Sequence, residues 1–197
     1  MKAKTLAMKQ AQANAVGVVL ISVVLVLGGS GFAGEKHGRH ASAEQQVYSA
    51  EDLSVEKPVP LPTTVLYILK KDKTVQNVLE AENLSPNSLP RSWFSASVVH
   101  LSRNKKDDLV VVGNPPVSGG NLAMFWVFRA TGQGYNLVLS ASAHSLHFEN
   151  PRWNGYRTVQ LTGFTAMEYS KVWYRFEAGR YIQYKEKSGK IEELRDR

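Results

Sequence analysis

The chain has 197 residues, a formal net charge of +7 and no cysteine. The absence of cysteine excludes a disulfide framework, thiol catalysis and cysteine metal sites, so a hydrophobic core must stabilise the fold. Without residues 1–33 the net charge is +4, which is ordinary for the remaining length and makes no case for a nucleic-acid partner.

Residues 1–33 have the pattern of a secretory signal peptide. Three lysines precede an apolar run over 15–27, and Gly31 and Ala33 provide the small-x-small arrangement of a cleavage site. Cleavage there leaves 164 residues with a net charge of +4. The alternative is an uncleaved anchor, because the apolar stretch that ends at Ala33 approaches the length that spans a bilayer. In both cases we expect the rest of the chain to be exported, as a periplasmic or secreted protein.

Residues 34–62 are polar and end in the sequence EKPVPLP, which predicts a flexible, proline-containing linker. A single globular, β-rich domain is predicted over 63–187. The charged segment over 188–197 is predicted to be a solvated tail. The sequence therefore indicates one domain behind a tether.

The domain is predicted to begin with a strand over 63–71 and a helix over 72–85, where apolar residues recur at helical spacing. Either Asp72 or Thr74 is expected to cap the start of the helix. A short helical turn is expected over 89–94 before the chain changes to strands.

Eight short segments rich in β-branched and aromatic residues follow, each bounded by Gly, Asn or Pro. They cover residues 95–101, 108–113, 123–129, 135–141, 144–148, 157–163, 168–176 and 180–185. This pattern predicts a mostly β fold with minor α. We expect an antiparallel meander of two four-strand, blade-like units, as one curved sheet or two packed sheets, with one short N-terminal helix packed on it.

The two groups of four predicted strands are similar to each other. Aligning HLSRNKKDDLVVVG with NPRWNGYRTVQLTG places Asn104 on Asn154 and Gly113 on Gly163, an offset of 50 residues. The offset falls to 46 at the tyrosines that open the last strand of each group. A period near 50 is typical of propeller blades, so the sequence predicts an internal duplication.

The first unit resembles the blade motif of the FG-GAP and VCBS type repeats, in which a loop with Asp or Asn at alternating positions leads into Asp-Leu-Val-Val-x-Gly. In that family the loop binds calcium. The resemblance implies ligand positions at His100, Ser102, Asn104 and Asp108, and in the second unit at Asn150, Arg152, Asn154 and Thr158. Calcium prefers six to eight oxygens with several carboxylates, so we expect no metal at either loop. Instead, Asn104, Asp108, Gly113 and Gly163 are expected to shape turns.

No motif argues for an enzyme or a cofactor. His144 and His147 alternate along a predicted strand and therefore lie on opposite faces, where they cannot share a metal. The Pro/Gly-rich loop over 113–121 lacks the lysine of a phosphate-binding loop. The adjacent carboxylates of Asp107 and Asp108 diverge at a strand entry, whereas glycoside hydrolysis needs two that face each other.

Aromatic and basic residues in the segment NPRWNGYR are the strongest candidates for binding. They are Arg152, Trp153, Asn154, Tyr156 and Arg157. Trp, Tyr and Arg are the residue types that anchor interfaces. We expect the predicted loops over 150–157 and 113–122 to form one contact surface.

The leading hypothesis is an exported, non-enzymatic β-domain that binds a protein or glycan partner at the cell envelope. We expect no nucleic-acid partner, and membrane contact only through an uncleaved signal segment. One alternative is an envelope hydrolase or an enzyme inhibitor, in which His100, His147 and a carboxylate would converge in a cleft. The other alternative is a membrane-tethered assembly factor.

Overall fold

The computed structural model describes residues 44–192. They form two antiparallel sheets and two α-helices, which confirms the predicted mostly β fold with minor α. The predicted signal peptide, the first part of the predicted linker and the end of the predicted tail lie outside the described residues.

The first sheet, here called the inner sheet, is a meander of four consecutive strands. These are β2 (Phe94–Val99), β3 (Asp108–Gly113), β4 (Ala123–Thr131) and β5 (Gly134–Ala143). All four were predicted, and Gly113 ends β3 as expected. The short 3-10 turns η1 (Pro86–Ser88) and η2 (Arg91–Trp93) lead into β2, so the predicted helical turn over 89–94 is also confirmed.

The second sheet, here called the outer sheet, has the strand order β1-β6-β7-β8-β9. Its strands are β1 (Val47–Ser49), β6 (Ser145–Trp153), β7 (Tyr156–Phe164), β8 (Glu168–Glu177) and β9 (Arg180–Lys190). Each group of four predicted strands thus forms a meander in its own sheet. The predicted tail over 188–197 is wrong at its start, because β9 continues to Lys190. The duplication and the FG-GAP resemblance stay predictions.

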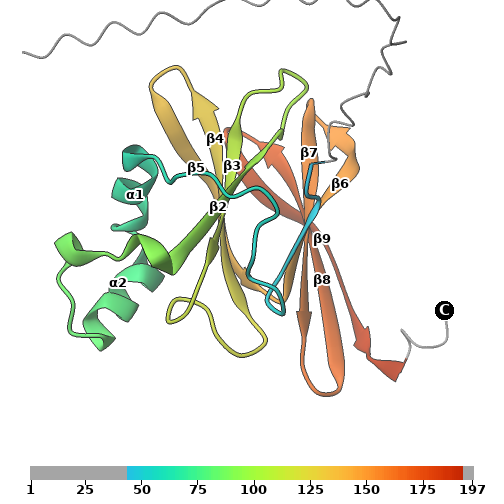
Figure 1. Ribbon diagram of the computed structural model, residues 1–197. Coiled ribbons are helices and arrows are strands. Elements are labelled where there is room, and N and C mark those ends of the chain that lie inside the picture. The colour runs from blue at the N-terminus through green and yellow to red at the C-terminus, as the bar shows by residue number, and fades with distance from the viewer. Residues whose placement is uncertain (1–43, 193–197) are drawn as a thin grey trace, which may run out of the picture. The chain divides into compact units, whose positions relative to one another are not determined.

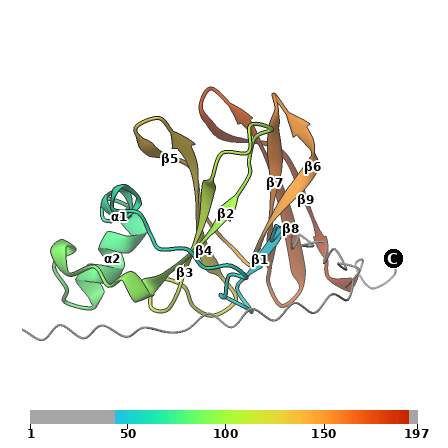
Figure 2. The same cartoon turned by 45° about the horizontal axis from the view of Figure 1, so that its top comes forward.

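The described domain has three layers, with the inner sheet between the helices and the outer sheet (Figure 1 and Figure 2). Alternate residues of β4 serve two different cores. Phe125 and Val127 pack between the sheets, whereas Trp126 and Phe128 pack against the helices. Because side chains alternate along a strand, this sheet buries both of its faces.

The predicted strand over 63–71 is wrong, since this segment forms helix α1 (Thr63–Leu69). Its β-branched residues favour a strand locally. However, Val65, Leu66 and Leu69 all lie buried on one side of the helix, against the inner sheet. The domain therefore has two helices and not one, and tertiary packing decides the conformation of this short segment.

Helix α2 (Lys73–Ala81) confirms the predicted helix over 72–85. The Asp72 carboxylate caps it by accepting hydrogen bonds from the backbone N–H groups of Thr74 and Val75. The other carboxylate oxygen of Asp72 accepts a 2.9 Å hydrogen bond from the Trp126 indole. The cap therefore also ties the helix layer to the inner sheet.

The predicted flexible linker over 34–62 is wrong for its described part. Tyr48 in β1 is fully buried between the sheets, and its hydroxyl hydrogen-bonds to Ser97 of β2 at 2.8 Å. Further along, the Val59 N–H donates to the Ala96 carbonyl at the edge of the inner sheet. The segment from residue 44 to 62 thus crosses from one sheet edge to the other and holds the sheets together.

The β6–β7 hairpin is tighter than the sequence predicts. Only Asn154 and Gly155 separate the two strands, and both have positive φ values, 49° and 81°. Two such residues are typical of a type I′ turn, whose twist matches that of the flanking strands. The predicted loop over 150–157 is therefore mostly paired strand.

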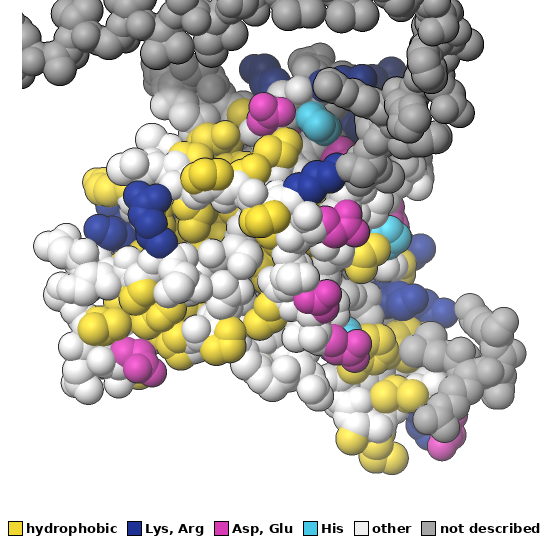
Figure 3. All heavy atoms as spheres, in the orientation of Figure 1, with side chains coloured by type: hydrophobic (Ala, Val, Ile, Leu, Met, Phe, Trp, Pro, Cys, Tyr) yellow, Lys and Arg dark blue, Asp and Glu magenta, His cyan; other side chains and the backbone are white. Residues whose placement is uncertain are grey.

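The two sides of the domain differ in their surface chemistry. On the face drawn in Figure 3, apolar side chains gather over the helix layer, whereas charged side chains and histidines lie mainly toward the outer sheet.

Candidate functional site

The two segments predicted to form one contact surface lie at opposite ends of the described domain. The loop over 113–122 lies beside the start of β6, where His144 Nδ1 is 3.3 Å from the Asn121 carbonyl. The segment over 150–157 lies at the far end of β6, about 25 Å away at the rise of an extended strand (Figure 1). The predicted joint surface is therefore wrong.

The end that carries the β6–β7 hairpin, here called the hairpin end, contains a polar pocket of about 290 Å³. Three segments meet there: the loop between β2 and β3, the β4–β5 hairpin and the start of β7. The polar side chains that line the pocket are Ser102, Asn104, Lys106, Asp108, Arg129, Thr131 and Tyr156. The topology thus gathers hydroxyl, amide, carboxylate and cationic groups that lie as far apart in sequence as Ser102 and Tyr156.

Asp108 fixes the shape of this pocket. Its two carboxylate oxygens accept hydrogen bonds from the backbone N–H groups of Leu101 at 3.0 Å and Ala130 at 2.8 Å. The residue is 1% exposed. Burial raises the pKa of the Asp108 carboxyl, and the two backbone amides offset this only in part. Asp108 therefore ties the β2–β3 loop to the β4–β5 hairpin, in line with its predicted role in shaping a turn.

Arg129 and Tyr156 form the wall of the pocket opposite the loop. The Tyr156 ring stacks on Phe176, with centroids 4.0 Å apart and planes at 23°. Arg129 Nη1 donates to the Tyr156 hydroxyl at 3.5 Å, which leaves the hydroxyl proton available to a ligand. The sequence reasoning missed Arg129, although a single arginine that ends the apolar run AMFWVFR was a usable signal.

Arg157 is not the surface residue that the sequence predicts. It is 3% exposed, and its guanidinium donates to Glu44 at 3.1 Å and to the Phe148 carbonyl at 2.9 Å. Its Nε has no hydrogen-bond partner among the described residues. Burial lowers the pKa of the Arg157 guanidinium, while the nearby Glu44 acts in the opposite direction. Arg157 is therefore part of the seam between the sheets.

The remaining predicted binding residues have separate roles. Arg152 donates to the Leu101 carbonyl at 2.6 Å and so holds the β2–β3 loop. Asn154 shapes the hairpin turn. Trp153 is 45% exposed and is not among the residues that line the pocket. The Arg175 guanidinium lies 4.7 Å from its ring centroid. Of the five predicted residues, only Tyr156 lines the polar pocket.

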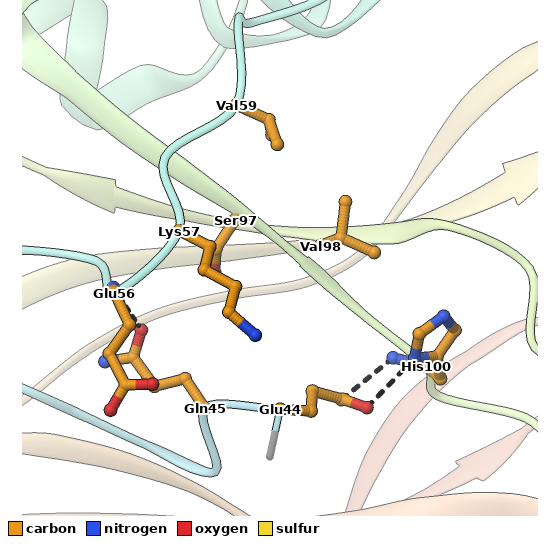
Figure 4. A pocket seen from close by; sticks show the side chains of 8 residues that line it. All are labelled: Glu44, Gln45, Glu56, Lys57, Val59, Ser97, Val98 and His100. Atoms are coloured by element: carbon orange, nitrogen blue, oxygen red, sulfur yellow. Dashed lines mark hydrogen bonds and ion pairs between the residues drawn. The ribbon is translucent and has the colours of Figure 1, made fainter. Parts of the chain in front are cut away.

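A second hollow of about 300 Å³ lies where the segment from residue 44 meets the edge of β2. Figure 4 shows Glu44 and His100 joined across its rim. Glu44 accepts from the His100 backbone N–H, and its other oxygen is 2.9 Å from His100 Nδ1. His100 Nε2 lies 3.6 Å from Asp107. The polar groups of this hollow are thus already paired in holding the segment in place.

The two histidines named for an enzyme do not converge. His100 follows β2, whereas His147 lies in β6 and pairs with Val47 and Gln160 in the outer sheet. Within residues 44–192, no group of three or more His, Asp or Glu side chains is arranged to hold a metal ion. The part of the chain that the structure describes also contains no helix with the length and apolarity of a membrane span.

Comparison with known proteins gives no match to a family model, to a curated protein or to a solved structure. Function is therefore inferred from the chemistry of this chain alone. The polar pocket brings hydroxyl, amide, carboxylate and cationic side chains of the described residues together in a small space.

Proposed function

We propose that this protein is an exported, non-enzymatic binding module of the cell envelope, and that its polar pocket binds a glycan. One observation carries the proposal: side chains from three separate segments converge on the pocket and offer both donors and acceptors. A sugar presents several hydroxyl groups that each donate and accept, so it needs such a mixed lining.

The size and lining of the pocket favour a sugar over a protein side chain as the ligand. Its volume of about 290 Å³ is at the lower limit for small-molecule sites, which suits one sugar residue at the end or at a branch of a glycan. Lys106 and Arg129 can donate, Asn104 can do both, and the stacked Tyr156 ring adds an apolar surface. Export is supported by the N-terminal sequence pattern.

Binding fits the pocket better than hydrolysis. Glycoside hydrolysis requires two carboxyl groups on either side of the scissile bond, whereas Asp108 is the only carboxylate among the residues that line this pocket. Both of its oxygens already accept hydrogen bonds from backbone amides. These features support a site that holds a glycan without cleaving it.

The proposal is tested by screening the purified protein against immobilised oligosaccharides of bacterial envelopes and comparing variants on the best binder. Lys106→Ala and Tyr156→Phe each remove one donor from the pocket, and we expect each to weaken binding about tenfold, the effect of one hydrogen bond. Arg103→Ala is the control, because Arg103 is exposed on the same loop, outside the pocket, and its loss changes the charge equally.

Two results would overturn the proposal. The first is the absence of binding to any oligosaccharide in the panel. The second is an equal effect of Lys106→Ala and Arg103→Ala, because the pocket would then contribute only general positive charge.

A further inference from the structure

The outward face of the outer sheet carries aromatic and cationic side chains that contact each other in pairs. Residues of β6 such as Leu146 and Phe148 point into the core between the sheets, so the alternate residues point away from it. We call this surface the cationic-aromatic face. It is defined by Trp153, Lys171, Trp173, Arg175, Tyr184 and Lys185.

Arg175 is the centre of this face. Its guanidinium carbon lies 4.7 Å from the ring centroid of Trp153 and 5.5 Å from that of Tyr184. Its Nε is 2.8 Å from a Glu177 oxygen. The N–H does not point at that oxygen, so the contact is an ion pair and not a hydrogen bond. The two terminal nitrogens have no partner among the described residues, and the rings hold them in place for a ligand.

A second pair lies next to the first. Lys185 is directly opposite Trp173 in the β8–β9 ladder, and its Nζ lies 4.5 Å from the Trp173 ring centroid. Lys171 and Lys187 form the following pair of opposed residues. Outward residues of one strand are about 7 Å apart, so aromatic and cationic groups alternate along a continuous strip.

The polar residues of this face indicate which class of partner it fits. The positions across β6 and β7 are occupied by His147, Gln160 and Thr162, where a protein interface would have an apolar centre. Aromatic rings that lie beside cations on a polar surface suit the stacking of sugar rings. The Arg175 side chain is 32% exposed, and its two terminal nitrogens suit a carboxylate, which they can bind with two parallel hydrogen bonds.

The charge of the face fits a sparsely charged polymer. Five cations on it, Lys171, Arg175, Arg180, Lys185 and Lys187, are opposed by two acids, Glu149 and Glu177. Nucleic acid carries one phosphate per nucleotide and is bound by denser basic surfaces. A polysaccharide with an occasional carboxylate requires only such a small excess of positive charge.

We propose that the cationic-aromatic face binds an acidic polysaccharide, with sugar rings on Trp153 and Trp173 and a carboxylate on Arg175. This surface is separate from the polar pocket, which opens at the hairpin end between the sheets, and the proposal does not depend on that pocket.

The test is a binding titration of the purified protein with hyaluronan, which carries a carboxylate on every second sugar ring, with neutral dextran and single-stranded poly-dT as comparison probes. We expect binding to hyaluronan that weakens with added salt, little binding to dextran, and binding to poly-dT that is weaker than binding to hyaluronan. Arg175→Ala should lower the affinity for hyaluronan at least tenfold. Arg175→Lys should restore only part of it, because an ammonium lacks the planar fork.

Controls separate this face from the rest of the molecule. Trp153→Ala should leave the thermal unfolding temperature nearly unchanged while weakening binding, and Lys106→Ala in the polar pocket should have no effect on the affinity for hyaluronan. Equal binding of dextran, tighter binding of poly-dT, or full affinity in folded Arg175→Ala and Trp173→Ala variants would each overturn the proposal.

Discussion

The inner and the outer sheet are both antiparallel meanders, but they differ in how many of their faces are covered. All six residues of β3 in the inner sheet are buried. In β9 of the outer sheet, Tyr181 is the only buried residue of eleven. The inner sheet packs against helices on one side and the outer sheet on the other. No described residues cover the outward face of the outer sheet.

This difference separates the stabilising part of the molecule from the part available to ligands. A strand buried on both faces reads as a continuous apolar run, as in LVVV and AMFWVF, whereas a strand with one open face alternates. The open face of the outer sheet is therefore free to carry cations and aromatic side chains without loss of core. The comparison can be tested at equivalent positions of the two sheets.

The largest expected effect concerns two tryptophans on the faces turned away from the core between the sheets. Trp126 of β4 is fully buried, packs edge-to-face on Phe94 and donates to Asp72. We expect Trp126→Ala to lower the free energy of unfolding by about 3–5 kcal/mol. For Trp173→Ala in β8 we expect less than about 1 kcal/mol, the usual result at a surface position. Urea denaturation measures both.

Equal losses for these two substitutions would contradict the comparison. That result would mean that the outward face of the outer sheet is covered in solution, either by a second copy or by residues outside the described range. A concentration dependence of unfolding would then distinguish the two.

The second prediction compares the buried charge that each sheet carries at the hairpin end. Asp108→Ala leaves the backbone N–H groups of Leu101 and Ala130 without an acceptor, and we expect the free energy of unfolding to fall by about 3 kcal/mol. Arg157→Met in the outer sheet keeps the packing and removes a charge whose Nε is already unpaired, so we expect a loss of about 1 kcal/mol. Thermal unfolding of the two variants shows which substitution lowers stability more.

A larger loss for Arg157→Met would show that the seam between the sheets, and not the inner sheet, limits stability. Asp107→Ala is the control for Asp108, because the neighbouring Asp107 side chain is 74% exposed. We expect it to change stability by no more than about 0.5 kcal/mol.

The strands and helix α2 could be predicted from the sequence because their signals are local. Periodicity, a cap at Asp72 and turn residues are all read within a few positions. Helix α1 could not be predicted in this way. Its seven residues include several β-branched ones, and they become helical because Val65 and Leu69 pack on the inner sheet. Strand β1 was missed for a similar reason, since Tyr48 is a single apolar residue in a polar segment.

The candidate site was predictable only in pieces. The loop residues Asn104 and Asp108 stood out by type and spacing, and the exposure of Trp153 follows from a hairpin turn beside it. The burial of Arg157 could not be predicted from the local sequence, because its partner Glu44 is 113 residues away. The convergence of Arg129 and Tyr156 on one pocket likewise depends on how the two sheets pack, which no local pattern records.

The third prediction concerns the contact that joins the two sheets. Burial raises the pKa of the Tyr48 hydroxyl from 10.0 to about 12. Its contribution to stability is therefore fully present below pH 10 and lost as pH rises through about 12, a change on the order of 2–3 kcal/mol. Tyr48→Phe should unfold with a weaker pH dependence between pH 10 and 11.5, measured by urea titration at each pH.

Other tyrosines and lysines titrate in the same range, so the informative quantity is the difference between wild type and Tyr48→Phe. Burial also raises the pKa of Tyr181, whose hydroxyl donates to the Arg157 carbonyl. Identical slopes for the two proteins would mean that Tyr48 is solvated and that the segment from residue 44 does not close the seam.

The smallest expected effect compares the connections of the two sheets. Gly155 in the β6–β7 turn has a φ of 81°, a conformation that costs an alanine about 1 kcal/mol. Gly119 in the loop between β3 and β4 has open space around it and no positive φ, so Gly119→Ala should be neutral. Because Trp153 and Tyr156 are the paired residues that flank this turn, Gly155→Ala should weaken ligand binding at the pocket and at the cationic-aromatic face together. A stability loss without any loss of binding would show that the strands, and not the turn, position these two side chains.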